Sequence, residues 1–307
     1  MDPFSSSLGE TGVVIIDGGL ATALEARGAD LADELWSARL LLDEPDLIAG
    51  VHRAYLDAGA DVVITASYQA SVGGFMGRGL APTDANALIT RSVTLAREAR
   101  DAWWGDGRPG RRRPLVAASV GPYGAVLADG SEYTGRYDLG VDELAAFHHE
   151  RLRTLAAAGP DLLAIETIPS LDETRALAQV ADSCPDVPTW WSFTCGDDAH
   201  LADGSPFTDA VDVAARATSA VAVGVNCTDP RLVTALVARA TSHTDLPVVV
   251  YPNRGATWDA TAKRWVGGAG VDLPALAPEW RDAGARAIGG CCGTLPADIA
   301  AIVSSLS

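Results

Sequence analysis

Short β-branched apolar runs alternate eight times along this chain with longer stretches whose apolar residues recur at helical spacing. Short apolar runs are typical of parallel strands buried on both faces, and their alternation with helices predicts βα units. Eight such units in one α/β chain predict a single (β/α)8 TIM barrel over residues 1–307. The predicted strands are Val13–Ile16, Val62–Thr65, Leu115–Ser119, Leu162–Ile165, Thr189–Phe193, Ala222–Val225, Val248–Tyr251 and Ala287–Gly289.

The stretches between these runs predict helices, several of which begin near Ser, Thr, Asp or Pro. They are Asp46–Ala58, Thr83–Trp103, Val141–Ala158, Ser170–Ala181, Phe207–Ser219, Pro230–Thr241, Asp272–Ala283 and Pro296–Leu306. Gly59, Gly159 and Gly284 each precede a strand, where a left-handed residue commonly ends a helix. Trp190 and Trp191 are expected to pack on the two sides of one strand.

Polar residues follow the predicted strands. In barrels of this class the catalytic groups come from the carboxyl ends of several strands, so the active site is expected there. The residues at this rim include Asp17, Gly18, Ser67, Tyr68, Gln69, Ser119, Glu166 and Asn226.

Three cysteines fall on the same rim: Cys227 after the sixth strand, and Cys291 and Cys292 after the eighth. Three protein ligands leave the fourth zinc position open, which is typical of catalytic zinc. Three thiolates make zinc a weak Lewis acid but keep a fourth, substrate thiolate nucleophilic, which favours thiol alkylation over water activation. Buried unpaired cysteines or a redox pair are the simpler alternatives.

Composition excludes several other classes. The net charge of −17 disfavours nucleic acid and anionic membranes as partners. The sequence has neither a leader-like start nor an apolar run that spans a bilayer, and its five cysteines suit a reducing compartment, so we expect a cytoplasmic protein. Cys184 and Cys195 are interpreted as structural. The five histidines lack metal-site spacing, and no phosphate-binding Gly-Lys loop occurs.

The chain resembles the zinc-dependent homocysteine S-methyltransferases, close to the bacterial enzymes that use S-methylmethionine. The resemblance is carried by Gly224–Cys227, Gly289–Gly293, Asp17–Gly28, Ile64–Ser71, Ser119–Ala125, Asp129–Tyr133 and Tyr251–Asn253. It implies zinc held by Cys227, Cys291 and Cys292, and methyl transfer from S-methylmethionine or S-adenosylmethionine to homocysteine. No catalytic residue beyond the zinc site and no protein partner is implied.

The other rim residues are interpreted as substrate contacts. Asp17 and Glu166 are candidates for holding a substrate ammonium, and Gly18 would let backbone N–H groups approach the carboxylate. Ser67, Gln69 and Ser119 would orient polar ends of either substrate, Asn226 would lie beside the metal, and Tyr68 and Tyr123 would face a sulfonium donor. Local caps, turns and core packing remain the alternative for each of them.

Two other functions stay open from the residues alone. Gly289–Gly293 is also compatible with a phosphate-binding loop, because barrels often bind phosphate after strands seven and eight. A thiol-based zinc store or redox sensor is the third possibility. Val72–Pro82 and Ala125–Tyr137 are candidate lids over the mouth.

Overall fold

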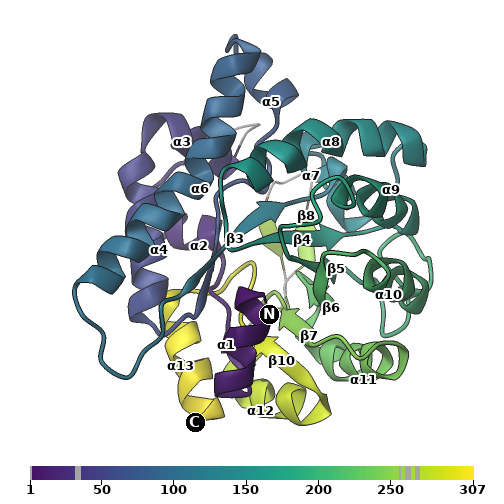
Figure 1. The fold of residues 1–307 in the computed structure, drawn as a ribbon. Coiled ribbons are helices and arrows are strands. Elements are labelled where there is room, and N and C mark those ends of the chain that lie inside the picture. The colour runs from purple at the N-terminus through teal and green to yellow at the C-terminus, as the bar shows by residue number, and fades with distance from the viewer. Residues whose placement is uncertain (1, 32–35, 256, 260–263, 267–269) are drawn as a thin grey trace.

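The structure is a computed structural model that describes residues 2–31, 36–255, 257–259, 264–266 and 270–307. Eight parallel strands form one sheet in the order β1-β10-β7-β6-β5-β4-β3-β2. A parallel bridge between Ile16 and Val62 joins the two outer strands of this order. The strands therefore close into a barrel, which Figure 1 shows surrounded by helices.

The barrel strands confirm the predicted runs: two match at both ends, and the others differ by one to three residues at one end or both. They are β1 Val14–Ile15, β2 Val62–Ile64, β3 Leu115–Val120, β4 Leu162–Ile168, β5 Thr189–Phe193, β6 Ala220–Asn226, β7 Val248–Tyr251 and β10 Ala285–Ile288. A short antiparallel hairpin that was not predicted, β8 Thr257–Asp259 with β9 Arg264–Val266, follows β7.

The outer helices also follow the prediction. They are α4 Pro45–Asp57, α6 Pro82–Gly105, α8 Val141–Ala157, α9 Leu171–Ala181, α10 Phe207–Ala215, α11 Val233–His243, α12 Leu273–Ala283 and α13 Pro296–Leu306. Gly59, Gly159 and Gly284 all have positive φ, as predicted for residues that end helices before strands. No described helix is long and apolar enough to cross a membrane.

Shorter helices that were not predicted lie in the connections. They are α1 Pro3–Thr11, α2 Leu20–Glu25, α3 Leu40–Asp43, α5 Val72–Met76, α7 Tyr123–Leu127 and the 3₁₀ turns η1 Trp36–Arg39, η2 Ser131–Tyr133 and η3 Pro230–Leu232. The predicted lid segments thus contain α5 in the first case and the end of α7 with η2 in the second.

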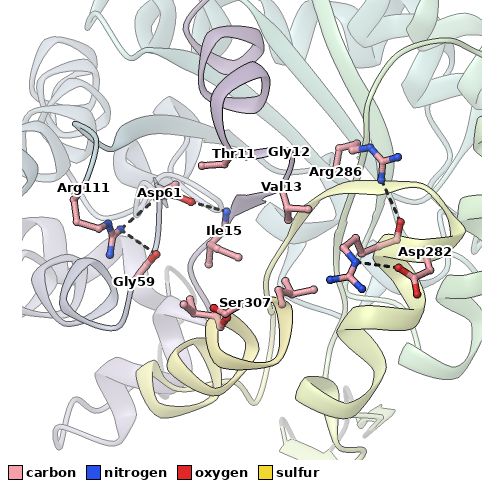
Figure 2. Close-up of a pocket in the computed structure, with 13 residues that line it drawn as sticks. Thr11, Gly12, Val13, Ile15, Gly59, Asp61, Arg111, Asp282, Arg286 and Ser307 are labelled. Carbon is pink, nitrogen blue, oxygen red and sulfur yellow. Dashed lines mark hydrogen bonds and ion pairs between the residues drawn. The ribbon is translucent and has the colours of Figure 1, made fainter.

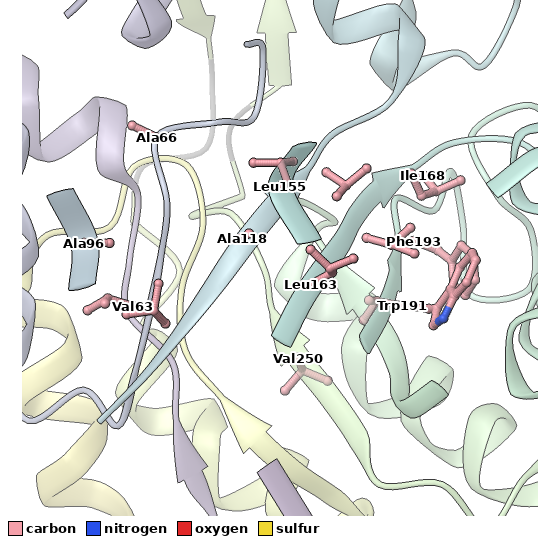
Figure 3. Close-up of a cluster of buried hydrophobic side chains, with 14 of the residues drawn as sticks. Val63, Ala66, Ala96, Ala118, Leu155, Leu163, Ile168, Trp191, Phe193 and Val250 are labelled. Carbon is pink, nitrogen blue, oxygen red and sulfur yellow. The ribbon is translucent and has the colours of Figure 1, made fainter. Parts of the chain in front are cut away.

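Two apolar layers hold the barrel together. The larger layer lies between strands and helices, and Figure 3 shows part of it, including Val63, Leu163 and Trp191. The smaller layer fills the barrel interior and includes Phe4 and Trp190. Trp190 and Trp191 are both fully buried and lie in different layers, because successive side chains of a strand face opposite sides.

Candidate metal centre and substrate site

Cys227, Cys291 and Cys292 converge at the carboxyl ends of the strands. Their sulfur atoms all lie within 4.8 Å of one another, and those of Cys227 and Cys292 are 3.5 Å apart. Cys227 follows β6, the other two follow β10, and β7 lies between those strands. All five cysteines are free thiols. The three sulfurs therefore form a cluster that can hold a metal ion.

Backbone contacts to the segment after β7 position both sides of this cluster. The Cys227 N–H donates to the Tyr251 carbonyl at 3.2 Å, and the Cys291 N–H donates to the Pro252 carbonyl at 2.8 Å. The Asn253 side chain also donates to the Cys227 carbonyl at 3.3 Å. Tyr251–Asn253, a segment of the predicted family motif, thus aligns the cysteines from two strands that do not touch.

The pKa values of the three thiols are shifted in opposite directions. Hydrogen bonding from Cys291 and Cys292 lowers the pKa of Cys227 well below the ordinary value of a thiol, against the opposing effect of burial. The same contacts with Cys227 raise the pKa of Cys291 and Cys292. Two thiols thereby stabilise one thiolate, which is the ionisation state that a metal ligand requires.

The glycines of the Gly289–Gly293 loop serve close packing. A Cβ on Gly289 would lie 2.6 Å from the Ile16 carbonyl, and one on Gly290 would lie 2.6 Å from the Thr294 side chain. The N–H groups of Gly289, Gly290 and Cys291 donate to Val250, Asp17 and Pro252 carbonyls. The Gly293 N–H donates to the Thr22 hydroxyl at 2.9 Å. Four of the five amides of this loop are therefore occupied within the protein, which argues against the phosphate-binding loop that the sequence left open.

Asp17 and Glu166 lie at the same rim, both buried. Asp17 accepts from the Ile64 N–H at 2.9 Å through Oδ2, whereas its buried Oδ1 has no partner among the described residues. Glu166 accepts from the Ser119 hydroxyl. Burial raises the pKa of Asp17 well above its usual range and that of Glu166 to about 7. The charge of Glu166 also raises the pKa of Asp17, so a cationic ligand between them would stabilise their ionised forms.

The other predicted contacts are largely engaged within the protein. Ser67 shares a hydrogen bond with Thr65 and donates to the Ser119 carbonyl at 2.8 Å. Gln69 donates to the Ala125 carbonyl at 2.9 Å, but its buried Oε1 has no partner among the described residues. Of this group, the Gln69 carbonyl is therefore the atom free to accept from a ligand.

The Asn226 side chain joins the carboxyl ends of β4 and β6 by hydrogen bonds. Its Oδ1 accepts from the Thr167 N–H and its Nδ2 donates to the Thr167 hydroxyl, both at 2.7 Å. The Asn226 side chain therefore holds Thr167, which follows Glu166, against the end of β6, where Cys227 comes next in the chain. Gly18 is equally constrained, since a Cβ there would lie 2.7 Å from Thr294 Oγ1 and 2.8 Å from the Tyr55 ring.

The two tyrosines predicted to face a donor lie in different surroundings. Tyr68 is half-buried, and burial raises the pKa of its hydroxyl well above the usual range. The charges of Glu132 and Cys227 raise that pKa further, so Tyr68 lies within electrostatic range of the cluster. Tyr123 instead packs edge-on against Tyr137 and Phe147, with ring centroids 5.3 and 5.0 Å away. The aromatic environment of Tyr123 is therefore provided by the protein itself.

Sequence reasoning missed two side chains that contact residues of the site. The Tyr133 hydroxyl lies 3.6 Å from the Cys227 sulfur, and buried Arg151 donates to the Ser67, Tyr68 and Gly121 carbonyls. Tyr133 stands in Asp129–Tyr133, a segment noted only for its resemblance. Arg151 lies inside a helix, where an arginine usually faces solvent, and no local pattern distinguishes it.

A hollow of about 810 Å³ lies at the opposite end of the barrel, lined by residues such as Ile15, Asp61 and Arg286. Figure 2 shows that its arginines contact neighbouring groups of the protein. Arg111 donates to the Gly59 carbonyl at 3.0 Å, and Arg286 donates to the Arg281 carbonyl at 3.1 Å. These arginines tie chain segments together away from the sulfur cluster.

Comparison with known proteins agrees with this arrangement. A family model described as homocysteine S-methyltransferase matches residues 14–306. The homocysteine S-methyltransferase of Escherichia coli strain K12 is 48% identical, covering 98% of this chain and 97% of its own length. Homocysteine S-methyltransferase YbgG of Bacillus subtilis strain 168 is 43% identical, covering 99% of this chain and 98% of its own.

A crystal structure of the homocysteine methyltransferase MmuM from Escherichia coli, in its metallated form, has the same fold. It superposes with a TM-score of 0.90 and 46% sequence identity over 99% of both chains. Whole-length similarity in sequence and fold, with the sulfur cluster at the catalytic rim of the barrel, leads to one assignment. The chain belongs to the homocysteine S-methyltransferase family, whose members are enzymes.

Proposed function

We propose that this homocysteine S-methyltransferase is zinc-dependent and takes its methyl group from S-methylmethionine, with S-adenosylmethionine as a poorer donor. The convergence of three cysteine sulfurs carries the proposal. Tetrahedral zinc binds sulfur at about 2.3 Å, which sets its ligands roughly 3.8 Å apart. The 3.5 Å between the sulfurs of Cys227 and Cys292 supports such a site.

Cys227, Cys291 and Cys292 would be the protein ligands, leaving one position for the homocysteine thiol. Bound zinc would lower the pKa of that thiol and hold it as a nucleophilic thiolate. Asp17 and Glu166 would receive the substrate ammonium, whose charge favours their ionised forms. The Gln69 carbonyl would accept a further hydrogen bond from a substrate.

The chemistry is a single displacement. The homocysteine sulfur forms a bond to the methyl carbon, the bond from that carbon to the sulfonium breaks, and its electron pair stays on the departing methionine sulfur. A negative thiolate and a positive sulfonium become two neutral thioethers. A site that excluded water would favour this loss of charge, because solvent would stabilise neither charged reactant.

We also propose that residues 1–307 form one homocysteine-binding domain and that the enzyme works in the cytoplasm with small-molecule substrates. The closed eight-stranded barrel supports the first statement. Five free thiols, three of them needed in reduced form at the site, support the second.

The test is methionine formation from homocysteine and S-methylmethionine, with zinc content measured on the same samples. Chelation should abolish turnover and added zinc should restore it. Cys227→Ser should lose zinc and at least about a hundredfold in activity, because serine is a poor zinc ligand. Cys184→Ser, a matched change away from the cluster, should retain both.

Full turnover by metal-free protein would contradict zinc dependence. Turnover with S-adenosylmethionine alone would contradict the proposed donor while leaving the metal site intact. Measuring both donors on the same zinc-loaded preparation separates these outcomes.

A further inference from the structure

Glu132 is a buried carboxylate for which the protein provides no complete set of partners. Its side chain lies in η2 and the residue is 8% exposed. Its Oε2 is buried without a hydrogen-bond partner among the described residues. An ionised carboxylate left in this state is costly unless a positive charge lies beside it, which indicates that a cationic ligand completes the site.

The surrounding backbone holds Glu132 in place. Asp129 Oδ1 accepts from the Ser131 N–H at 2.9 Å, and Gly130 has a left-handed φ of 86° before the turn. Gly124 packs directly against the turn, because a Cβ there would lie 2.5 Å from the Glu132 nitrogen. The position of the carboxylate is therefore built into the fold.

The charged groups that act on Glu132 are negative, and two tyrosines lie close to it. Burial, together with the charges of Cys227 and Asp129, raises the pKa of Glu132 to about 7, against the opposing effect of hydrogen bonds from the Glu132 and Gly130 backbone. Its own charge acts on Tyr68, while adjacent Tyr133 places a hydroxyl 3.6 Å from the Cys227 sulfur. Negative charge beside two aromatic rings and the reactive sulfur is an environment that attracts a cation.

We propose that Glu132 binds the positively charged sulfur of the methyl donor, an inference that rests on the proposed function. The sulfonium must lie next to the cysteine cluster for its methyl group to reach the homocysteine sulfur, and Glu132 is within electrostatic range of Cys227. A sulfonium donates no hydrogen bonds, so it needs only nearby negative charge and aromatic faces. An ammonium needs several acceptors, and Asp17 and Glu166 provide carboxylates for it elsewhere at the rim.

This role makes Glu132 a specificity residue with a defined kinetic signature. The sulfonium loses its charge during methyl transfer, so a neighbouring carboxylate stabilises the bound donor more than the transition state. Removing the carboxylate charge should raise KM for the donor while kcat stays unchanged or increases. KM for homocysteine should be unaffected.

The experiment compares zinc-loaded wild type with Glu132→Gln, which keeps the shape and removes the charge, and with Glu132→Asp, which keeps the charge. Glu98→Gln, an exposed glutamate on α6, is the matched control. Glu132→Gln should raise KM for S-methylmethionine about tenfold, a factor consistent with one partly screened charge pair. Glu132→Asp should raise it less, and it keeps the test valid if the glutamine variant does not fold.

Calorimetric binding of S-methylmethionine and of methionine distinguishes the sulfonium from the ammonium. Both ligands carry the same ammonium and carboxylate, but only the first carries a charged sulfur. Glu132→Gln should weaken S-methylmethionine about tenfold and leave methionine unchanged. Equal losses for both ligands, a change confined to KM for homocysteine, or no change at all would overturn the inference. Because wild-type turnover is measured alongside, failure of the proposed donor would appear separately.

Discussion

Two residues beside the cluster adopt backbone conformations that their side chains disfavour. Thr167 and Cys227 have φ values of 59° and 49°, in the left-handed region. They follow Glu166 and Asn226, and the Asn226 amide bonds Thr167 through both of its polar atoms. Such strain is common at functional sites, where surrounding contacts enforce it. Here it turns two strand ends so that a carboxylate and a thiol occupy the same rim.

Buried His52 should make the protein sensitive to acid. It lies on α4 with neither ring nitrogen hydrogen-bonded to a described residue, and burial lowers its pKa to about 4. The unfolded chain binds this proton near pH 6.5, whereas the folded protein binds it only near pH 4. Its contribution to stability is complete above pH 6.5 and is lost as the pH falls toward 4.

We therefore expect wild type to lose about 2 kcal/mol more unfolding free energy than His52→Leu between pH 7 and pH 5. Urea denaturation of both proteins at the two pH values measures this difference. Equal losses of unfolding free energy in the two proteins would mean that His52 does not cause the acid sensitivity. Subtracting the loss in His52→Leu from the loss in wild type removes the contributions of other titrating groups.

At the scale of elements, α8 fixes the loops that carry the substrate residues. Arg151 on this helix donates to the carbonyls of Ser67, Tyr68 and Gly121 at 2.7, 2.5 and 2.8 Å. Nearby Glu173 at the start of α9 accepts from His148 and from the Tyr123 N–H. Charged residues of two outer helices thus reach inward and hold the connections after β2 and β3.

Arg151→Met should lower the unfolding free energy by about 3 kcal/mol, because three buried carbonyls lose their donor. It should also reduce kcat/KM, since Tyr68 is no longer held. Arg153→Met, an exposed change on the same helix, is the control and should alter stability by less than about 0.5 kcal/mol. Urea denaturation measures the stability of each variant, and steady-state kinetics measures kcat/KM. Equal stability of the two variants would show that the Arg151 hydrogen bonds do not hold these loops.

Sequence predicted the repeating elements well because buried parallel strands leave a continuous apolar signal, as in Val248–Tyr251. It also located the rim residues, since they directly follow those strands. It missed α1, whose Pro3–Thr11 segment contains three serines and depends on an Asp2 cap and on burial of Phe4. It missed Tyr133 and Arg151 as site residues because their roles arise from contacts with residues more than 60 positions away in the chain. It missed Glu132 because that residue lies in a short turn, which has no apolar periodicity.

At the scale of the whole molecule, the two ends of the barrel differ. The sulfur cluster and the buried carboxylates lie at the carboxyl ends of the strands, whereas α1 covers the amino ends. Phe4 belongs to the interior layer together with Val14, Val62 and Leu115, which start three of the strands. Arg112 anchors α1 through Glu10 at 2.9 Å and through the Ser7 carbonyl. The separation allows stability and chemistry to be altered independently.

Phe4→Ala tests that independence. The Phe4 ring is fully buried and packs edge-on against Trp190, with ring centroids 6.0 Å apart. Its removal should lower the unfolding free energy by about 3 kcal/mol and change Trp190 fluorescence, because a cavity opens inside the barrel. Zinc content and KM values should stay at wild-type levels, since the cluster lies at the other end.

Thr11→Ala, an exposed change on α1, is the matched control for Phe4→Ala. If α1 were only an appended helix, the two variants would have similar stability and Trp190 would not respond. A loss of zinc in Phe4→Ala under conditions where it is fully folded would instead show that the two ends are coupled. Urea denaturation, fluorescence and metal analysis on the same preparations separate these outcomes. A change in stability and fluorescence alone means that α1 only closes its end of the barrel, whereas a change in zinc content means that the two ends are coupled.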